Sequence, residues 1–418
     1  GHLRCRACWR HCLRLTSAGQ SPCPRRRGPE DVAFPRRKTR EGHLLRPRRI
    51  LHVFGRMARG GAESRTLEVM RHVDPGSFRL DYCALSGLAG PLDQEVIELG
   101  GRVHLVPLQS SFPFRFKKLL REESYDVVHS HVHYFSGYIL RLSAKAGVEQ
   151  RICHFRNSSD GHPKSLRRRV QRRIMKGWID SKATHILAVG EGAMIGSWGE
   201  AWREDPRCQV IYNGIDPRRF SGPVERASVR SDVGVPLNGP VAINVARMDP
   251  AKNHLKLVSV FEEICLEVPQ IHLLLVGRGG NQVEEEVRKR LDTAGLNDRV
   301  TIAGERGDVP RLLRACDLFL FPSKYEGLPG AVLEACAAGL PVLASDLPGV
   351  LEIASRIDGV HCLPKEADDS EWAQVAAGLL PEEDSAGSHS PAIDRLLGTP
   401  FDISICAEAM TRVWSDVD

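Results

Sequence analysis

The chain has 418 residues, which is too long for one ordinary hydrophobic core and suits two domains of ordinary size. Its formal net charge of +6 comes from residues 1–49, which hold fourteen Lys or Arg against three acidic residues and leave the remaining chain at −5. The charge therefore gives general nucleic-acid binding no electrostatic support outside this segment, and an apolar fraction of 42% is that of a soluble globular protein.

The cysteines indicate a reducing compartment. Of the twelve in the chain, Cys83, Cys265, Cys316 and Cys336 lie in apolar contexts, which predict buried free thiols. No apolar run approaches the length of a transmembrane helix, and the longest, such as residues 271–277, are typical of buried strands. We therefore expect a cytoplasmic protein that is soluble or peripheral to the membrane.

Residues 1–47 are rich in Arg, Pro and Cys and lack hydrophobic periodicity, so we predict a disordered extension. No apolar core follows its basic residues, which argues against a signal peptide. Only one C-x2-C pair is present, without the second pair that a zinc site needs, so a metal site is not favoured. The candidate ligands are Cys5, Cys8, His11, Cys12 and Cys23.

From residue 49 the pattern changes to a buried strand, a turn at Gly60 and Gly61, and an amphipathic helix. This order opens a doubly wound α/β domain. The two glycines would let the backbone approach a ligand closely, although a plain strand-to-helix turn fits them equally well. They do not form GxGxxG, so a dinucleotide-binding fingerprint is not supported.

Further strands are expected at residues 79–85, 102–108 and 126–131. The last of these delivers His129, His131 and His133 to its carboxyl end, where ligands of open α/β sheets bind. Alternation would place all three histidines on one face, so it does not select among them. A lone histidine in such a strand is more often structural.

Residues 164–178 form a basic amphipathic segment with seven Lys or Arg between positions 164 and 176. Leu166, Val170, Ile174 and Trp178 recur at four-residue spacing, which predicts a helix. Two interpretations stay open: contact with an anionic membrane surface, or a solvated helix whose apolar stripe packs on its own domain.

The second half of the chain is predicted to begin after the Asn213-Gly214 turn, which we attribute to the tolerance of these residues for positive φ. Residues 217–239 are polar and predict a linker. The next buried strand runs into a loop that carries Arg247 and Lys252. Fixed cations at that edge would stabilise a leaving diphosphate, whereas ordinary surface charge is the alternative explanation.

Residues 322–346 place Glu326 in a loop rich in Gly and Pro and Glu334 eight positions later in a helix. The loop ends at Gly330 and Ala331, where unpaired N–H groups and the helix dipole form an anion site. Because a phosphate would repel a carboxylate, the natural partner of Glu334 is a neutral ribose or sugar hydroxyl. One loop and helix could therefore hold a nucleotide-sugar.

The segment EGLPGAVLEA resembles the Glu-x7-Glu motif of the retaining GT-B glycosyltransferases of family four, the glycosyl transferases of group 1. The resemblance runs from about Arg48 to the C-terminus and includes HSH, NGID and ARMDPAKN. It implies an α/β fold of GT-B architecture, with two Rossmann-like domains facing a central cleft. The implied domains are an acceptor-side domain at 48–217, a nucleotide-sugar-binding domain at 218–400, and a C-terminal helix at 401–418 that crosses back onto the first domain.

The resemblance also implies roles for single residues. In the family Arg247 and Lys252 would contact the donor diphosphate, Glu326 the donor sugar, and His131 the acceptor side. The base would lie near the loop at 304–306. The residues assigned to catalysis are Glu326, Arg247, Lys252 and His131, and those assigned to donor binding are Glu334, Gly330, Ala331, Gly60, Gly61 and Arg306.

The expected reaction transfers a sugar from a UDP- or GDP-linked donor to a hydroxyl of a polysaccharide or lipid-linked glycan, with retention at the anomeric carbon. We expect no metal or other cofactor, because no Asp-x-Asp pair occurs in the predicted cleft segments. Four alternatives stay open: a non-catalytic GT-B-fold binding protein, a sugar-nucleotide epimerase, a glycan phosphorylase and a dinucleotide-dependent oxidoreductase. The oxidoreductase would need GxGxxG and a downstream acid, and neither half shows them.

Overall fold

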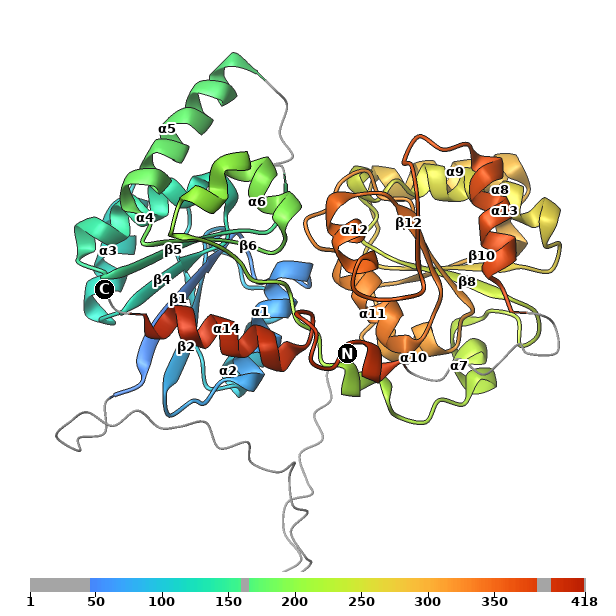
Figure 1. Ribbon diagram of the computed structural model, residues 1–418, viewed down its shortest axis with the longest axis horizontal. Helices are drawn as coiled ribbons and strands as arrows, with labels where there is room; N and C mark the ends of the chain where they lie inside the picture. Colours follow the sequence, from blue (N-terminus) through green and yellow to red (C-terminus); the bar gives the residue numbers. More distant parts are fainter. Residues whose placement is uncertain (1–45, 159–164, 382–391, 417–418) are drawn as a thin grey trace, which may run out of the picture. The chain divides into compact units, whose positions relative to one another are not determined.

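The computed structural model describes residues 46–158, 165–381 and 392–416. The predicted extension and its candidate metal ligands, together with Lys164 and the serine-rich stretch at 382–391, lie outside these residues. The described residues form two parallel sheets, one with seven strands and one with six, and helices pack on both (Figure 1). Among the described residues no helix is both long and apolar enough to cross a membrane.

The first sheet has the strand order β3-β2-β1-β4-β5-β6-β7, so the chain changes direction between β1 and β4. Its strands are β1 (Arg48–Phe54), β2 (Phe78–Ala84), β3 (Val103–Leu105), β4 (Val127–Ser130), β5 (Gln150–Phe155), β6 (His185–Ala188) and β7 (Cys208–Val210). The helical segments are α1 (Gly61–His72), α2 (Asp93–Glu98), α3 (Phe112–Glu122), η1 (His133–Phe135), α4 (Ser136–Ala146), α5 (Leu166–Lys182), α6 (Glu191–Ser197) and η2 (Glu200–Glu204).

Alternation along β1 sends successive side chains to opposite faces of this sheet. Ile50 and Phe54 are buried on the face covered by α1, α2 and the C-terminal helix α14 (Ile403–Ser415). Leu51 and Val53 are buried on the other face, against α3 and α4. The C-terminal helix therefore belongs to the core of the first sheet and lies beside α1 (Figure 1).

The second sheet has the order β10-β9-β8-β11-β12-β13 and changes direction between β8 and β11. Its strands are β8 (Val241–Val245), β9 (His272–Val276), β10 (Val300–Gly304), β11 (Leu318–Phe321), β12 (Val342–Ser345) and β13 (Val360–Leu363). The helical segments are η3 (Pro217–Phe220), α7 (Arg226–Val233), η4 (Pro250–Lys252), α8 (His254–Glu267), α9 (Gln282–Ala294), η5 (Asn297–Arg299), α10 (Val309–Arg314), α11 (Gly330–Ala338), α12 (Pro348–Ala354), α13 (Asp369–Leu379) and η7 (Ile393–Arg395).

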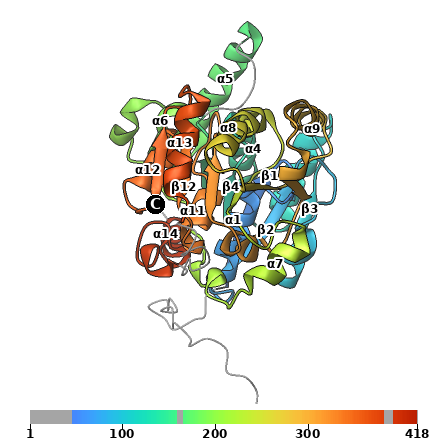
Figure 2. The same ribbon diagram turned by 90° about the vertical axis from the view of Figure 1, so that its right-hand side faces the viewer.

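The second sheet is also covered on both faces, as all-parallel sheets require. Helices α8, α9 and α13 bury one side of it, and α8 and α13 lie side by side (Figure 2). Helices α10, α11 and α12 contribute to the core on the opposite side. Both sheets are therefore doubly wound, and the predicted fold class is confirmed.

Two local expectations were wrong. The stretch predicted as a linker contains helix α7, whose start is capped by Glu225 through a 2.9 Å bond from the Ser228 amide. The Asn213-Gly214 turn does not use positive φ. Gly214 is needed for space instead, since a Cβ at this position would lie 2.6 Å from the Cα of Ile403.

The histidine-bearing strand also ends earlier than expected. Strand β4 stops at Ser130, and His133 opens a short 3-10 helix with a φ of 48°. Alternation therefore does not extend to His133, whose Nε2 lies 3.3 Å from the hydroxyl of Ser197. His129 and His131 keep the expected common face.

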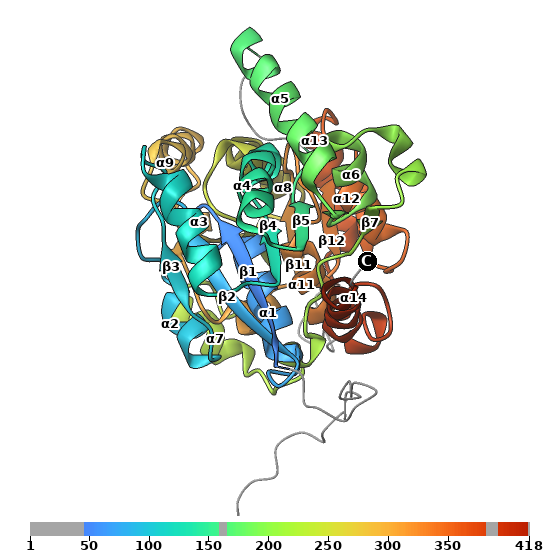
Figure 3. The ribbon, with the colours of Figure 1, turned by 90° about the vertical axis from the view of Figure 1, so that its left-hand side faces the viewer.

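Helix α5 confirms the predicted basic helix and runs beside α4, past which its first turns extend (Figure 3). Leu166, Val170 and Ile174 are 69%, 53% and 48% exposed, so this part of the apolar stripe does not pack on its own domain. Only Trp178, at the far end of the stripe, packs against the ring of Tyr138.

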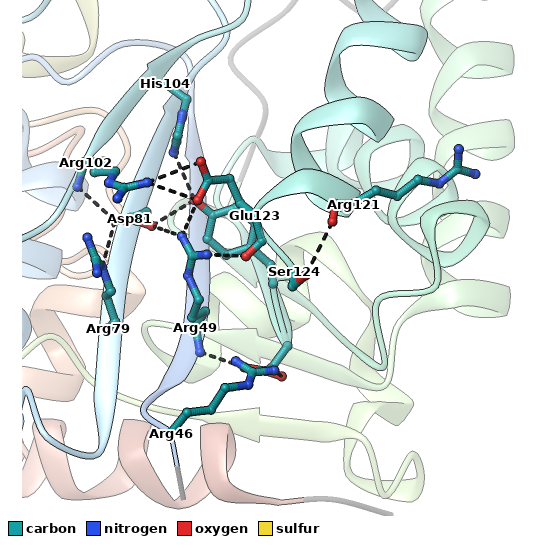
Figure 4. A network of polar contacts seen from close by, with 11 residues as sticks. Arg46, Arg49, Arg79, Asp81, Arg102, His104, Arg121, Glu123 and Ser124 are labelled. Carbon is teal, nitrogen blue, oxygen red and sulfur yellow. Dashed lines mark hydrogen bonds and ion pairs between the residues drawn. The ribbon is translucent and has the colours of Figure 1, made fainter.

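A buried charge network anchors the amino-terminal end of the first sheet (Figure 4). Asp81 is fully buried and accepts hydrogen bonds from the Tyr125 hydroxyl at 2.9 Å and the Arg102 amide at 2.9 Å. Arg49 pairs with Asp81 at 3.1 Å and with Glu123 at 2.7 Å. The network lies at the end of the strands opposite to the predicted site, so we assign it to stability.

The described cysteines are all free. Burial raises the pKa of Cys83, Cys316 and Cys336 to about 12, so these thiols stay protonated and unreactive near neutral pH. Cys265 is only half-buried, in contrast to the prediction that it lies in the core.

Candidate active site

The predicted site residues follow the strands on either side of the point where each sheet reverses its strand order. Gly60 and Gly61 follow β1, and His131 follows β4. In the second sheet Lys252 follows β8 and Glu326 follows β11. Ligands of open α/β sheets bind outside the carboxyl ends of the strands at such points. The topology therefore gathers residues that are far apart in the sequence at two sheet edges.

Lys252 and Glu326 form an ion pair across the reversal point of the second sheet. Strands β8 and β11 are adjacent and parallel, so the loops that follow them open at the same edge. Both side chains are largely buried, at 19% and 11% exposure. The structure thus joins a cation and a carboxylate that the sequence separates by 74 positions.

Arg247 lies on the same loop as Lys252 but is half-exposed, and its guanidinium is 3.4 Å from Asp249. Its positive charge also favours the ionised form of Glu63, which lies in the first turn of α1. Burial raises the pKa of Glu63, and the positive charges of Arg156 and Arg247 only partly offset this rise. The start of α1, with its two glycines, therefore lies within electrostatic range of Arg247 on the loop after β8.

Helix α11 begins with Gly330 and Ala331 after the N-cap residue Pro329, whose side chain has no oxygen that could cap the helix. Its first N–H groups therefore point outward without a side-chain acceptor, which is the arrangement expected at an anion site. The helix ends at Gly339 with a φ of 83°, as the sequence predicts.

Glu334 lies one turn into α11 and contacts Arg65 of α1. Arg65 is buried, and its other terminal nitrogen lies 2.5 Å from Glu68. Nothing in the local pattern around position 65 distinguishes this arginine from a surface residue, and sequence reasoning missed it.

His131 is held between two partners. Its Nδ1 accepts a 3.1 Å hydrogen bond from Arg156 Nε, and its Nε2 lies 3.0 Å from His52 Nδ1. The ring stacks on Phe54 with centroids 4.3 Å apart. Because the guanidinium can only donate, His131 is a neutral tautomer that carries its proton on Nε2 and donates it to His52.

A second chain of hydrogen bonds lies beside the first. Trp414 Nε1 donates to His129 Nδ1 at 3.2 Å, and His129 Nε2 therefore donates to His154 Nδ1 at 3.0 Å. The four histidines His52, His129, His131 and His154, which we call the histidine cluster, share the sheet face under α1 and α14. Burial is the main cause that lowers the pKa of each member, to about 3 for His52.

Nitrogens of His52, His129 and His131 lie within 4.8 Å of one another, which is also a spacing found in metal sites. In the tautomers described above, both nitrogens of His129 and of His131 take part in hydrogen bonds. Neither ring then has a free lone pair for a metal ion. The cluster is therefore best described as a buried hydrogen-bond network.

Arg156 was not predicted, because strand β5, which delivers it, was overlooked. Its Nη1 donates to Asn213 at 2.7 Å, and burial lowers its pKa to about 10. Among the residues that the structure describes, no carboxylate lies within ion-pair distance of it. The signal that could have revealed β5 was the short run ICHF, which is mostly apolar and follows the turn at Gly147.

Arg306 lies on the loop after β10 and forms a two-point ion pair with Asp308, at 2.9 and 2.8 Å. Asp308 occupies the N-cap position of α10, as expected. Its carboxylate, however, accepts hydrogen bonds from Arg306 and does not cap the helix. The assignment of this loop to the nucleotide base stays a prediction.

Comparison with known proteins agrees with this geometry. Residues 59–219 match the sequence family described as Glycosyltransferase Family 4, and residues 225–383 match Glycosyl transferases group 1. The capsular polysaccharide biosynthesis glycosyltransferase CapH of Staphylococcus aureus is 33% identical over 303 residues, which cover 72% of this chain and 81% of CapH. The chain therefore belongs to the family of glycosyltransferases described as group 1 and family 4.

A second relative supports the family, and a solved structure shows the fold. The putative glycosyltransferase EpsF of Bacillus subtilis is 30% identical over 343 residues, covering 79% of this chain and 87% of EpsF. Anabaena HepE, whose crystal structure contains UDP and glucose, superposes with a TM-score of 0.74 at 20% identity, over 88% of this chain and 99% of HepE. The second comparison shows the shared GT-B fold.

Proposed function

We propose that this glycosyltransferase transfers a sugar from a UDP- or GDP-linked donor to a hydroxyl of a glycan or lipid-linked acceptor, with retention at the anomeric carbon. The observation that carries the proposal is the gathering of Lys252, Glu326 and the open start of α11 at the reversal point of the second sheet. A leaving diphosphate needs cations and N–H donors there, and sugar and ribose hydroxyls need carboxylates.

Each residue has a proposed role. Arg247 and Lys252, with the amides at Gly330 and Ala331, stabilise the leaving diphosphate, and no metal or other cofactor takes part. Glu326 orients the donor sugar. Glu334 accepts hydrogen bonds from the ribose.

The acceptor side is proposed to lie at the edge of the first sheet. His131 lines it, with Gly60 and Gly61 close to the donor phosphates and Arg306 close to the base. Because both ring nitrogens of His131 are hydrogen-bonded to protein, its proposed contribution is to shape and hold this edge.

Relatives support a polysaccharide or lipid-linked acceptor. The name of CapH places it in capsular polysaccharide biosynthesis. A second relative, 27% identical over 259 residues, is the Escherichia coli UDP-Gal:alpha-D-GlcNAc-diphosphoundecaprenol alpha-1,3-galactosyltransferase. An acceptor of this chemistry is held in a membrane, so we propose that the enzyme works at the cytoplasmic face of one.

Two measurements test the proposed reaction on the full chain. Thermal stabilisation by UDP, GDP, ADP, TDP and NAD would identify the nucleotide, since a ligand that binds only the native state raises the melting temperature more the more tightly it binds. We expect UDP or GDP to stabilise the protein, Glu334→Gln to lose the effect, and Glu371→Gln, an exposed helix residue of the same domain, to keep it. Stabilisation by NAD alone would contradict the proposal.

The stereochemistry needs a product measurement. Proton NMR of the glycoside formed from a UDP- or GDP-sugar reads the anomeric configuration directly. We expect the configuration of the donor to be kept, and an inverted product would contradict retention while leaving the transfer reaction intact.

Helix α5 is the proposed membrane contact. Three apolar side chains of its first turns are exposed beside a cluster of arginines, as in helices that lie in the headgroup region of anionic bilayers. The exposed basic residues of the helix are Arg167, Arg169 and Arg173.

Vesicle binding tests this contact. Replacing Arg169 and Arg173 with Gln should weaken binding to vesicles that contain phosphatidylglycerol, because each basic residue near the surface contributes about 1 kcal/mol. Replacing Arg288 and Lys289 of α9 with Gln removes the same charge elsewhere and should have no effect. Equal binding by both variants would contradict the membrane contact.

A further inference from the structure

Arg65 is a buried arginine that joins two helices from different sheets. It lies on α1 and is 7% exposed. One terminal nitrogen pairs with Glu68 on the same helix at 2.5 Å, and the other donates to Glu334 on α11. The guanidinium therefore connects the helix that follows β1 to the carboxylate proposed to bind the ribose.

The pair with Glu334 is held in place by a second arginine. Arg219 lies 2.6 Å from the other oxygen of Glu68, which is itself 4% exposed. Burial opposes the charge of Arg65, but Glu68 and Glu334 outweigh this and raise its pKa above the ordinary value. Charge and geometry thus resist movement of the guanidinium, and with it of the Glu334 oxygen that it contacts.

The third nitrogen of Arg65 faces the start of α11. Among residues 46–158, 165–381 and 392–416, Arg65 Nε has no hydrogen-bond partner although it is buried. A Cβ added to Gly330 would lie 3.3 Å from this nitrogen. The edge of the guanidinium is therefore packed against the first residue of the helix that begins the proposed donor site.

We propose that Arg65 is a positioning residue for the donor nucleotide: it fixes one oxygen of Glu334 so that the other oxygen accepts hydrogen bonds from the ribose hydroxyls. The inference rests on the proposed function and adds a residue of the first sheet to the donor site. A carboxylate that is free to rotate would bind the same hydroxyls with less selectivity, because it would have to be ordered upon binding.

The affinity ratio between UDP and 2′-deoxy-UDP tests this role on the full-length protein, by isothermal titration calorimetry. In the unaltered protein we expect UDP to bind at least about tenfold more tightly, since a hydrogen bond to a charged acceptor contributes this much. Arg65→Ala should bring the ratio close to one, and Arg65→Lys, which keeps the charge, should restore part of it. Arg71→Ala, on an exposed part of the same helix, should leave the ratio unchanged.

A double variant separates positioning from general damage. If Arg65 acts through Glu334, adding Arg65→Ala to Glu334→Gln should not change the ratio further. Equal losses of affinity for UDP and 2′-deoxy-UDP in both Arg65 variants, with the ratio kept, would overturn the inference and leave the proposed function standing. If the unaltered protein binds neither UDP nor GDP, in either form, the proposed function and this inference are both wrong.

Discussion

The histidine cluster should make the protein sensitive to mild acid. Its four members are buried and neutral, with folded pKa values below the 6.5 of an exposed histidine, and that of His52 is about 3. As the pH falls below 6.5, the unfolded chain takes up protons that the folded chain does not, so stability is lost between pH 6.5 and about 3.

The size of the effect follows from this difference. His52, with a pKa of 6.5 when unfolded and about 3 when folded, loses about 1.4 kcal/mol of stability between pH 7.5 and 5.5. The pKa values of His129, His131 and His154 are lowered in the same direction, so the cluster as a whole loses more stability than His52 alone. Even the loss from His52 alone is a sizeable part of the small unfolding free energy of a typical folded protein.

Urea unfolding followed by circular dichroism at pH 7.5 and 5.5 measures this loss. His154→Gln removes one titrating ring at the end of a hydrogen-bond chain, where Nε2 has no partner among the described residues. We expect its loss of stability between the two pH values to be smaller than that of the unaltered protein, because burial lowers the folded pKa of His154. The exposed His361→Gln should show the full loss.

Two outcomes would refute the reasoning. If His154→Gln and the unaltered protein lose the same free energy, His154 does not have a lowered folded pKa. If the unaltered protein is more stable at pH 5.5 than at 7.5, the cluster is charged when folded, and the hydrogen-bond directions that we deduce are wrong.

Three further predictions concern catalysis and the two sheets. Lys252→Gln should lower kcat by about a hundredfold, because it removes a cation from the leaving group and leaves Glu326 without its partner. Asp81→Asn should cost about 3 kcal/mol in urea unfolding, since Arg49 loses its buried counter-charge. Gly277→Ala should cost at least about 2 kcal/mol, because φ is +150° and the added Cβ would lie 1.9 Å from a carbonyl oxygen.

Each of these predictions has a clear contrary result. An unchanged kcat for Lys252→Gln, with Arg288→Gln as the charge control, would remove Lys252 from the reaction. A cost below about 1 kcal/mol for Asp81→Asn would show that the network in Figure 4 is not a structural anchor. Gly61→Ala serves as the control for Gly277, since a Cβ at Gly61 would meet no atom within 4 Å.

Local sequence was sufficient to predict the elements that carry the donor side. Arg247 and Lys252 follow a short apolar strand, and Glu326 and Glu334 flank a breaker-rich loop that leads into a helix. These patterns depend on a few neighbouring residues, and the different periods of helices and strands allow each element to be recognised from the sequence. The doubly wound fold follows from the same strand and helix order.

Other parts of the prediction failed where tertiary contacts decide the outcome. The segment 226–233 is polar and short, and it becomes helix α7 through its cap at Glu225 and its packing on α10. Gly214 was assigned a conformational role, whereas the reason for a glycine there is the closeness of Ile403, 189 positions further along the chain. Neither the packing of α7 on α10 nor the closeness of Gly214 to Ile403 can be predicted from the neighbouring residues in the sequence.

The sequence by itself determined the loops that carry Arg247, Lys252 and Glu326, because alternation and breaker residues act over a few positions. Only the tertiary structure decided which of those side chains meet. The Arg65–Glu334 pair spans 269 positions, and Trp414 reaches His129 across 285. The physical reason is that strand order and helix packing set these distances, and both depend on burying apolar surface over the whole chain rather than on any short segment.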